Sequence, residues 1–276
     1  MFKCLNVGML DQKASPEGSI ALASRFGYGG IDCSLKSVVD DGAFLTMLDE
    51  AKIKRGVCGG LLPGNCSVPD AEWNTAMDAL PLLAKRARTL GFTRTTLVIL
   101  PFHEKLPFDE NMKMHIDRVT LCVPMLAEHG IRVGLEYVAQ KTRRAGYPHE
   151  FIYDMKGLLR MIAASGTSAG VLLDAFHWFC ARETGDDITK LTNKQIVAVH
   201  VSDAVRGRPI DEQIAFEREL PGATGEIDIR GFINALSSIN YDGPVTAEPM
   251  NALLRSMPID DAIQVTAAAM TKIIGV

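Results

Sequence analysis

The sequence lacks the features that mark membrane-spanning and secreted proteins. No apolar stretch approaches the roughly 18 to 20 residues that a membrane-spanning helix needs. The opening segment, MFKCLNVGML, has neither the long apolar region nor the cleavage site of a signal peptide. We therefore expect a cytoplasmic protein with no membrane partner.

Cysteine pairs at the spacing of a zinc site or a disulfide framework are also absent. No Cys-x-x-Cys pair occurs, and the cysteines are scattered through mostly apolar segments. Such a distribution is typical of reduced cysteines in a protein core, and it argues against a zinc cluster. The six cysteines are Cys4, Cys33, Cys58, Cys66, Cys122 and Cys180.

Positive charge is in short supply. The chain has 29 Lys and Arg against 33 Asp and Glu, a formal net charge of −4. Binding to a phosphate backbone depends on clustered Lys and Arg, so we expect no nucleic-acid partner. With 47% hydrophobic and 22% charged residues the composition is that of a soluble globular protein. No linker or shift in composition divides the chain, which predicts one domain over residues 1–276.

Short apolar runs alternate with longer segments of helical periodicity, the pattern of a repeated βα unit. Eight strands are predicted, at residues 2–8, 29–34, 55–60, 95–101, 131–138, 169–175, 195–202 and 243–249. Eight helices are predicted between and after them, near residues 16–26, 40–53, 70–90, 109–129, 150–165, 186–191, 228–240 and 258–273. Pro81 and Pro124 fall inside two of these helices, which are therefore kinked or begin later.

This repeat predicts an α/β fold, a single (β/α)₈ TIM barrel of eight parallel strands with outer helices. Dividing 276 residues among eight units gives about 34 residues each, close to the usual size of such a barrel. An open doubly wound sheet is the rival, but its Gly-x-Gly-x-x-Gly turn after the first strand is missing. The longest irregular segment, residues 203–226, is either a lid over the site or a variable surface loop.

Four consecutive predicted strands each end in a residue of a type that commonly binds metal ions: Glu136, Asp174, His200 and Glu248. Any one of them alone has an ordinary explanation, such as a helix N-cap, a partner for Arg or a hydrogen-bonded core histidine. Strand ends of a parallel barrel converge, so all four side chains should share one small space. Three carboxylates there repel one another unless a cation is present. The set predicts one divalent metal ion, Mn²⁺, Co²⁺, Mg²⁺ or Zn²⁺.

The same residues carry a resemblance to the xylose-isomerase-like TIM barrel superfamily of sugar-phosphate isomerases and epimerases. The similar segments are the glutamate at position 136, DAFHW from Asp174, HVSDAVR from His200, AEP around Glu248, and PGATGEIDIRGFINAL from Pro221. The resemblance covers nearly the whole chain. It implies a small sugar or polyol substrate, manganese or a similar metal on the four strand-end residues, and a dimer or tetramer.

The resemblance also implies that His177 and Arg206 contact substrate oxygens. The ketose epimerases place a further acid where this sequence has Thr142, a departure that disfavours ketose 3-epimerisation in particular. Among the other histidines only His103, just past the fourth strand, is positioned to reach the barrel mouth. A basic group at the rim, Lys141, Arg143 and Arg144, is either solvated or binds an anionic group of the substrate.

The geometry of a barrel suggests a mechanism. Glu136 and Glu248 approach the centre from nearly opposed sides, so one can take a proton from a substrate carbon while the other delivers one. The metal would stabilise the enediolate between these steps, and His177 would donate a hydrogen bond to the developing oxyanion.

Three further hypotheses for the function compete with that of a sugar isomerase or epimerase. A lyase of the same superfamily would dehydrate a keto-inositol or a dehydroshikimate-like acid. A DNA-repair endonuclease of the AP-endonuclease type would need more histidines at strand ends than the chain provides. A non-catalytic barrel is disfavoured because all four ligand-type residues are present.

Overall fold

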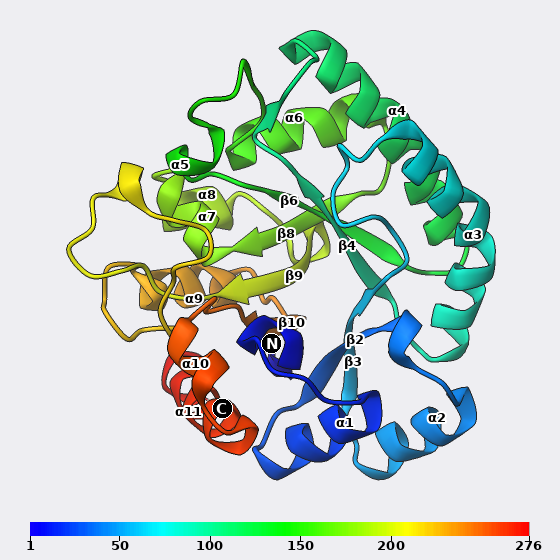
Figure 1. Cartoon of the computed structure of the whole chain (residues 1–276), viewed down its shortest axis with the longest axis vertical. Helices are drawn as coiled ribbons and strands as arrows, with labels where there is room; N and C mark the ends of the chain where they lie inside the picture. The colour runs from blue at the N-terminus through cyan, green and yellow to red at the C-terminus, as the bar shows by residue number, and fades with distance from the viewer. Residues whose placement is uncertain (276) are drawn as a thin grey trace.

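The predicted strands form one parallel barrel. A computed structural model describes residues 1–275 of the chain, and residue 276 lies outside the described part. The eight-stranded sheet has the order β3-β2-β1-β10-β9-β8-β6-β4 and is surrounded by helices (Figure 1). This arrangement confirms the TIM barrel. The strands are β1 (Phe2–Leu5), β2 (Gly30–Ser34), β3 (Lys54–Gly59), β4 (Arg94–Ile99), β6 (Arg132–Tyr137), β8 (Gly170–Asp174), β9 (Ile196–Val201) and β10 (Pro244–Ala247).

The barrel closes between β3 and β4, the two ends of the strand order, without a continuous ladder. Asn65, which follows β3, forms an isolated parallel bridge with Val98 of β4. Closer to the amino end of β4, the Thr95 hydroxyl donates a hydrogen bond of 2.8 Å to the carbonyl of Cys58 in β3. Two local contacts therefore replace the regular strand pairing found around the rest of the barrel.

The eight predicted helices are all present, and one begins later than predicted. The segment 150–165 is helical only as α6 (Met155–Ser165), because the Asp154 side chain accepts from the Gly157 amide and caps the helix there. The other seven are α1 (Pro16–Arg25), α2 (Asp41–Glu50), α3 (Asp70–Thr89), α4 (Phe108–Ala127), α8 (Gly185–Thr189), α9 (Ile229–Ser238) and α11 (Ile259–Ile274). Both α3 and α4 run through their prolines, which lie on exposed faces where water can reach the freed carbonyls.

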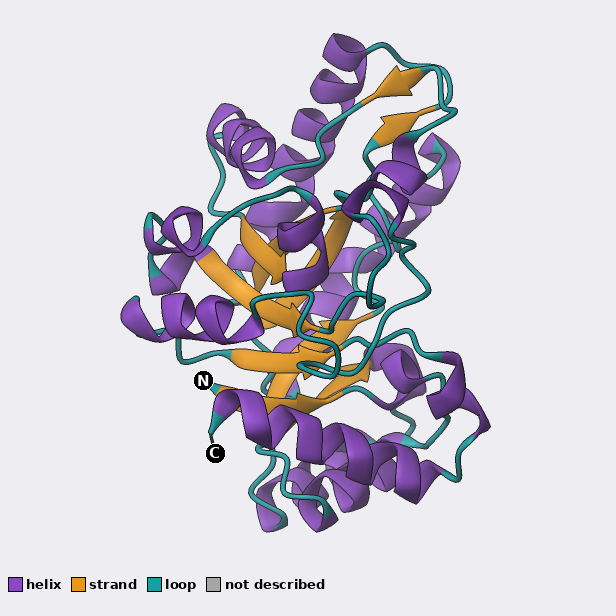
Figure 2. Cartoon of the chain, turned by 90° about the vertical axis from the view of Figure 1, so that its left-hand side faces the viewer, coloured by secondary structure: helices purple, strands orange, loops and turns teal. Residues whose placement is uncertain are grey.

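Short elements that the periodicity did not predict lie mainly at the carboxyl ends of the strands. These ends and their loops gather on one side of the barrel, while both chain termini lie on the opposite side (Figure 2). Among the described residues no helix has the length and apolar character needed to cross a membrane. The additional elements are η1 (Val7–Leu10), η2 (Leu35–Ser37), β5 (Phe102–His103), α5 (Lys141–Arg144), β7 (His149–Glu150), α7 (Ala175–Cys180), η3 (Asn193–Gln195), η4 (Ile210–Glu212) and α10 (Ala252–Ser256).

The apolar core lies mostly between the barrel and its helices. Strand β8 is buried along its whole length, as expected for a parallel strand covered on both faces. All six cysteines are free thiols, four of them buried and Cys33 and Cys180 half-buried. This agrees with the prediction of reduced core cysteines.

A buried carboxylate on β2 forms hydrogen bonds with three other strands, β1, β3 and β10. Asp32 lies at an irregularity in the pairing of β2 with β3. One of its oxygens accepts from the Val57 amide at 2.6 Å and the Cys4 thiol at 3.1 Å, and the other accepts from the Thr246 hydroxyl at 2.8 Å. Gly56 leaves the space for this carboxylate, since a Cβ there would lie 2.2 Å from an Asp32 oxygen.

Replacing Gly56 with Ala should therefore destabilise the barrel. The added methyl group collides with Asp32, with the Cys4 sulfur and with the Ile31 carbonyl, and relieving the clash should cost about 1 to 3 kcal/mol in free energy of unfolding. Gly64→Ala is the matched control, because no atom lies within 4 Å of a Cβ there. Urea denaturation measures both variants, and equal stabilities for the two would contradict this account.

Candidate active site

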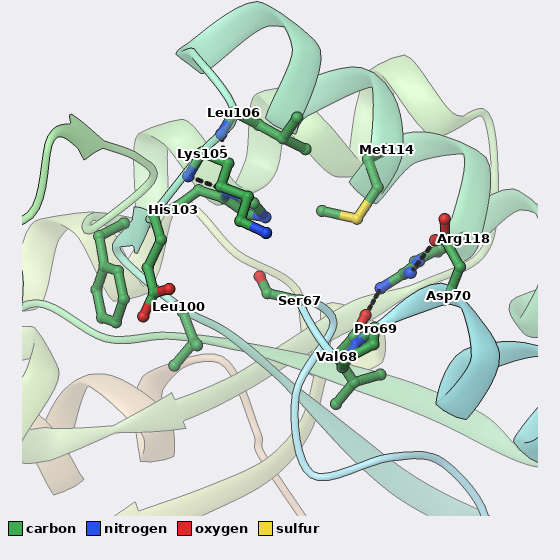
Figure 3. Close-up of a pocket in the computed structure, with 12 residues that line it drawn as sticks. Ser67, Val68, Pro69, Asp70, Leu100, His103, Lys105, Leu106, Met114 and Arg118 are labelled. Carbon is green, nitrogen blue, oxygen red and sulfur yellow. Dashed lines mark hydrogen bonds and ion pairs between the residues drawn. The ribbon is translucent and has the colours of Figure 1, made fainter.

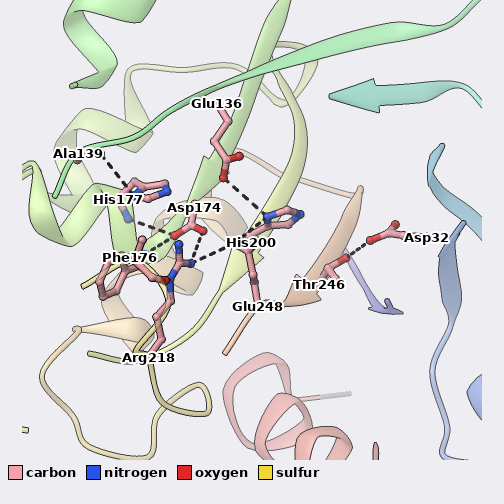
Figure 4. Close-up of polar contacts among 11 residues, drawn as sticks. Asp32, Glu136, Ala139, Asp174, Phe176, His177, His200, Arg218, Thr246 and Glu248 are labelled. Carbon is pink, nitrogen blue, oxygen red and sulfur yellow. Dashed lines mark hydrogen bonds and ion pairs between the residues drawn. The ribbon is translucent and has the colours of Figure 1, made fainter. Parts of the chain in front are cut away.

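Four side chains from four neighbouring strands meet at the carboxyl end of the barrel. Glu136 lies near the end of β6, Asp174 ends β8, His200 lies in β9 and Glu248 follows β10 directly. Each contributes one potential ligand atom, and these atoms all lie within 4.8 Å of one another (Figure 4). Asp174 and His200 are register partners on adjacent strands, which brings their side chains to the same level.

Asp174 also caps a helix. The chain turns from β8 directly into α7, and one Asp174 oxygen accepts from the amides of Phe176 at 2.6 Å and His177 at 3.1 Å. This N-cap fixes the carboxylate and leaves its second oxygen directed at the shared space. Asp174 therefore has two roles: it caps α7, and it belongs to the cluster of potential metal ligands.

The cation that contacts the acids in this structure is Arg218. One guanidinium nitrogen lies 2.8 Å from an Asp174 oxygen and 3.0 Å from a Glu248 oxygen, and the guanidinium carbon lies 4.4 Å from the centre of the Phe176 ring. The Arg218 side chain is only 4% exposed. Ion pairs at this depth are screened little by solvent, so Arg218 offsets part of the repulsion among the carboxylates.

Two atoms of the cluster remain without a hydrogen-bond partner among the described residues. One is an oxygen of Glu136, and the other is Nδ1 of His200. This nitrogen lies 3.8 Å from the Glu136 oxygen and 3.4 Å from a Glu248 oxygen. Buried polar atoms are rarely left unpaired, and an unpaired group in a polar cluster points to a missing ligand. Three carboxylates and one imidazole are a donor set that suits a divalent cation.

The protonation of the cluster follows from burying three acids together. Burial, and next the charge of Glu248, raise the pKa of Glu136 to about 8. Burial also opposes ionisation of Asp174, but the charge of Arg218 outweighs it and holds the pKa of Asp174 well below its usual range. Burial disfavours charged His200, yet Glu248 and Glu136 raise its pKa to about 9. At neutral pH the cluster by itself therefore keeps protons on Glu136 and His200.

His177 lies on the Asp174 side of the cluster as a neutral imidazole. Its Nδ1 accepts from the Ala139 amide at 3.4 Å, which leaves the proton of the neutral ring on Nε2. Burial lowers the pKa of His177 to about 4. His177 can therefore act as a hydrogen-bond donor through Nε2 near the acids, without carrying a charge.

The irregular segment 203–226 is held in shape by hydrogen bonds to its own first residue. Buried Asp203 accepts from four backbone amides, those of residues 204, 224, 225 and 227, at 2.8 to 3.0 Å. Residues 203 and 219 also exchange two backbone hydrogen bonds of 2.8 Å. These contacts hold Arg218, next to Glu219, at a fixed place over the site.

The remaining predicted site residues lie outside the cluster. Arg206 is exposed and donates to the Thr224 carbonyl at 3.0 Å. His103 lies on β5 at the edge of a separate cavity. At the rim, the guanidinium of Arg143 lies over the Phe102 ring and that of Arg144 over the Tyr153 ring. Lys141 is 3.7 Å from Asp211, so the three rim cations do not converge on one point.

Sequence reasoning missed Arg218 entirely. It sits in an irregular, charge-rich segment with no periodicity, and 44 residues separate it from Asp174. The one usable signal was the excess of buried acids over cations at the strand ends. That excess predicts a nearby cation but does not indicate which residue supplies it.

Replacing Arg218 with Met should destabilise the metal-free protein. Removing the guanidinium leaves Asp174 and Glu248 buried without their counter-charge, which typically costs about 3 to 5 kcal/mol in free energy of unfolding. Arg206→Met is the matched control and should change stability by less than about 0.5 kcal/mol, because Arg206 is exposed. Urea denaturation in the presence of a chelator tests the pair, and a stable Arg218 variant would overturn the role given to its ion pairs.

Comparison with known proteins supports the fold. The curated inosose isomerase of Bacillus subtilis (strain 168) is 22% identical over 183 residues, covering 66% of this chain and 63% of that protein. The 3-dehydroshikimate dehydratase of Pseudomonas putida is 28% identical over 139 residues, covering 49% of this chain and 21% of that protein. The chain therefore spans less than two thirds of the length of these relatives.

The fold is shared with a solved structure that contains a metal. The IOLI protein, whose structure has a bound zinc atom, aligns with a TM-score of 0.84 at 18% identity, covering 100% of this chain and 98% of that one. The sequence profile of the xylose isomerase-like TIM barrel matches residues 20–272. Since this match covers nearly the whole chain, the protein belongs to the xylose isomerase-like TIM barrel family.

Proposed function

We propose that this protein is a divalent-metal-dependent isomerase or epimerase of a small sugar, sugar phosphate or keto-polyol. The observation that carries the proposal is the buried group of three carboxylates and one imidazole, whose potential ligand atoms lie within 4.8 Å of one another. Its family relatives include enzymes that act on such compounds, among them an inosose isomerase.

The metal would be held by Glu136, Asp174, His200 and Glu248. The unpartnered atoms of Glu136 and His200 and the mixed oxygen and nitrogen donor set both support this assignment. When bound, such a cation would act as a Lewis acid toward a substrate carbonyl or hydroxyl oxygen. The zinc in the IOLI protein supports a divalent ion without deciding which one.

The chain's own residues divide the proton chemistry among them. Glu136 and Glu248 reach the site from β6 and β10, on either side of His200. One would remove a proton from a substrate carbon. The other would return one, to the neighbouring carbon in an isomerisation or to the opposite face of the same carbon in an epimerisation. His177 would donate from Nε2 to a substrate oxygen. Arg218, beside Glu248, would share the binding of substrate oxygens with Arg206, for which the family resemblance implies that role.

A lyase of the same family is the second candidate. The partial similarity to a 3-dehydroshikimate dehydratase favours it, because dehydration begins with the same removal of a proton beside a carbonyl group. Thr142 also bears on the choice. Its hydroxyl donates to the Gln213 carbonyl at 2.6 Å, so Thr142 binds the segment 203–226 and supplies no acid at this position, which disfavours ketose 3-epimerisation.

Replacing Glu248 with Gln should abolish proton exchange with solvent. A panel of ketoses, inososes and hydroxypyruvate is incubated in deuterium oxide with the manganese-loaded protein, and deuterium uptake is followed by NMR. The variant keeps an oxygen for the metal but has no titratable group, so exchange should fall at least about 100-fold.

Glu212→Gln provides the control for that experiment, because Glu212 is an exposed acid outside the cluster. Its exchange rate should equal that of the wild-type protein. Full exchange in the Glu248 variant would refute the acid–base assignment, and product analysis of the wild type would separate isomerisation from loss of water.

Metal affinity should rise steeply with pH. Since the pKa of Glu136 is raised to about 8 and that of His200 to about 9, both hold protons at pH 6 and must release them to bind a metal. The apparent affinity for Mn²⁺ should therefore increase at least about tenfold per pH unit between pH 6 and 8. Isothermal titration at several pH values measures this, and a constant affinity would contradict the protonation described for the cluster.

A further inference from the structure

A separate cavity opens beside the candidate site, between the start of α3 and the loop that leads into α4. Its volume is about 550 Å³, which lies within the range of small-molecule sites. Leu100, Phe102, Leu106 and Met114 supply apolar surface to its wall. The polar side chains of Ser67, His103 and Lys105 point toward its centre (Figure 3).

This cavity lies next to the acid cluster at the same end of the barrel. Val98 of β4 is the register partner of Glu136 in β6, so the two side chains leave the sheet on the same face. Leu100 follows Val98 by two residues and lines the cavity. At ordinary strand spacing the Cα atoms of Leu100 and Glu136 are about 8 Å apart. To occupy both the cluster and the cavity, a molecule would have to be longer than one six-membered ring.

The polar groups of the cavity include fixed donors and acceptors. Nδ1 of His103 accepts from the amides of Lys105 at 3.0 Å and Leu106 at 2.8 Å, so the neutral ring carries its proton on Nε2 and donates from there. Nδ1 of His115 donates to the Asn111 carbonyl at 2.8 Å, which makes its Nε2 an acceptor for the Ser67 hydroxyl at 3.4 Å. The Ser67 oxygen is thereby left to accept.

The charges around the cavity balance. The Arg118 guanidinium already has protein partners. It donates to the carbonyls of Cys66 and Val68, and it pairs with Asp70 at 2.6 Å. The charges that remain are those of Lys105 and Glu104, which have opposite signs. A free anion would meet Glu104 and a free cation would meet Lys105. Apolar walls with paired donors and acceptors instead suit a neutral ligand that bears hydroxyl groups.

We infer that this cavity is a second substrate subsite, which binds a neutral hydroxylated ring joined to the ring that reacts at Glu136 and Glu248. The inference rests on the proposed function and narrows its substrate to two-ring compounds, such as a glycoside of a keto-sugar or keto-polyol. His103 and Lys105 donate to hydroxyl oxygens of the second ring, and Ser67 and Glu104 accept from its hydroxyl groups. The apolar wall packs against its C–H groups.

Binding of one-ring and two-ring probes tests this subsite. Isothermal titration compares myo-inositol with galactinol, in which a galactose ring is joined to inositol, on wild-type protein with and without Mn²⁺. The second ring should tighten binding at least about tenfold, because two or three additional hydrogen bonds contribute on that scale. Lys105→Met and Ser67→Ala should each weaken galactinol binding at least about threefold, and neither should change the binding of myo-inositol.

Lys113→Met is the matched control, because Lys113 lies on the same helix as Met114, pairs with Asp117 and does not line the cavity. It should keep the full gain. Equal binding of the two probes by the wild type, no binding of galactinol, or an undiminished gain in both cavity variants would each overturn the subsite. A failure of the proposed metal-dependent function would give a different result: both probes would bind equally well with and without Mn²⁺.

Discussion

The repulsion among three carboxylates gathered at one end of the barrel is the constraint on which the rest of the site depends. Glu136, Asp174 and Glu248 are almost completely buried, where like charges are screened little and ionisation is costly. The structure answers this constraint in two ways. It inserts one permanent cation, Arg218, and it leaves protons on Glu136 and His200. Once both protons are released, three carboxylates and one arginine leave a net charge of −2, which a divalent ion would balance.

The same constraint accounts for the many hydrogen bonds that hold the segment 203–226 in shape. A guanidinium that balances buried acids must be held in place, and the four amides that bond to Asp203 fix the segment that carries it. The N-cap of α7 does the same for Asp174, so helix geometry and site geometry are set by one carboxylate. The cavity next to the cluster differs in kind, because its charges cancel within it. On our proposals this contrast would reflect two roles, with the cluster carrying out the chemistry and the cavity binding a neutral part of the substrate.

Most of the fold and much of the site could be predicted because their signals are local. Alternating apolar runs and helical periods located all eight strands, and the converging strand ends of a barrel predicted that Glu136, Asp174, His200 and Glu248 would meet. Contacts between distant, irregular segments could not be predicted in this way. The family resemblance indicated Arg206 as a substrate-binding residue, whereas no pattern in the sequence indicated Arg218, which lies beside the acids. The hydrogen bonds of Asp32 to three strands likewise depend on a bend in one strand that no local pattern signals.

Crystals soaked in manganese chloride and measured near the manganese absorption edge would test the central claim most directly. The account predicts one strong anomalous peak within coordination distance, about 2.0 to 2.4 Å, of side-chain atoms from Glu136, Asp174, His200 and Glu248. A protein whose four side chains stay metal-free under these conditions, or a peak held by other residues, would contradict it.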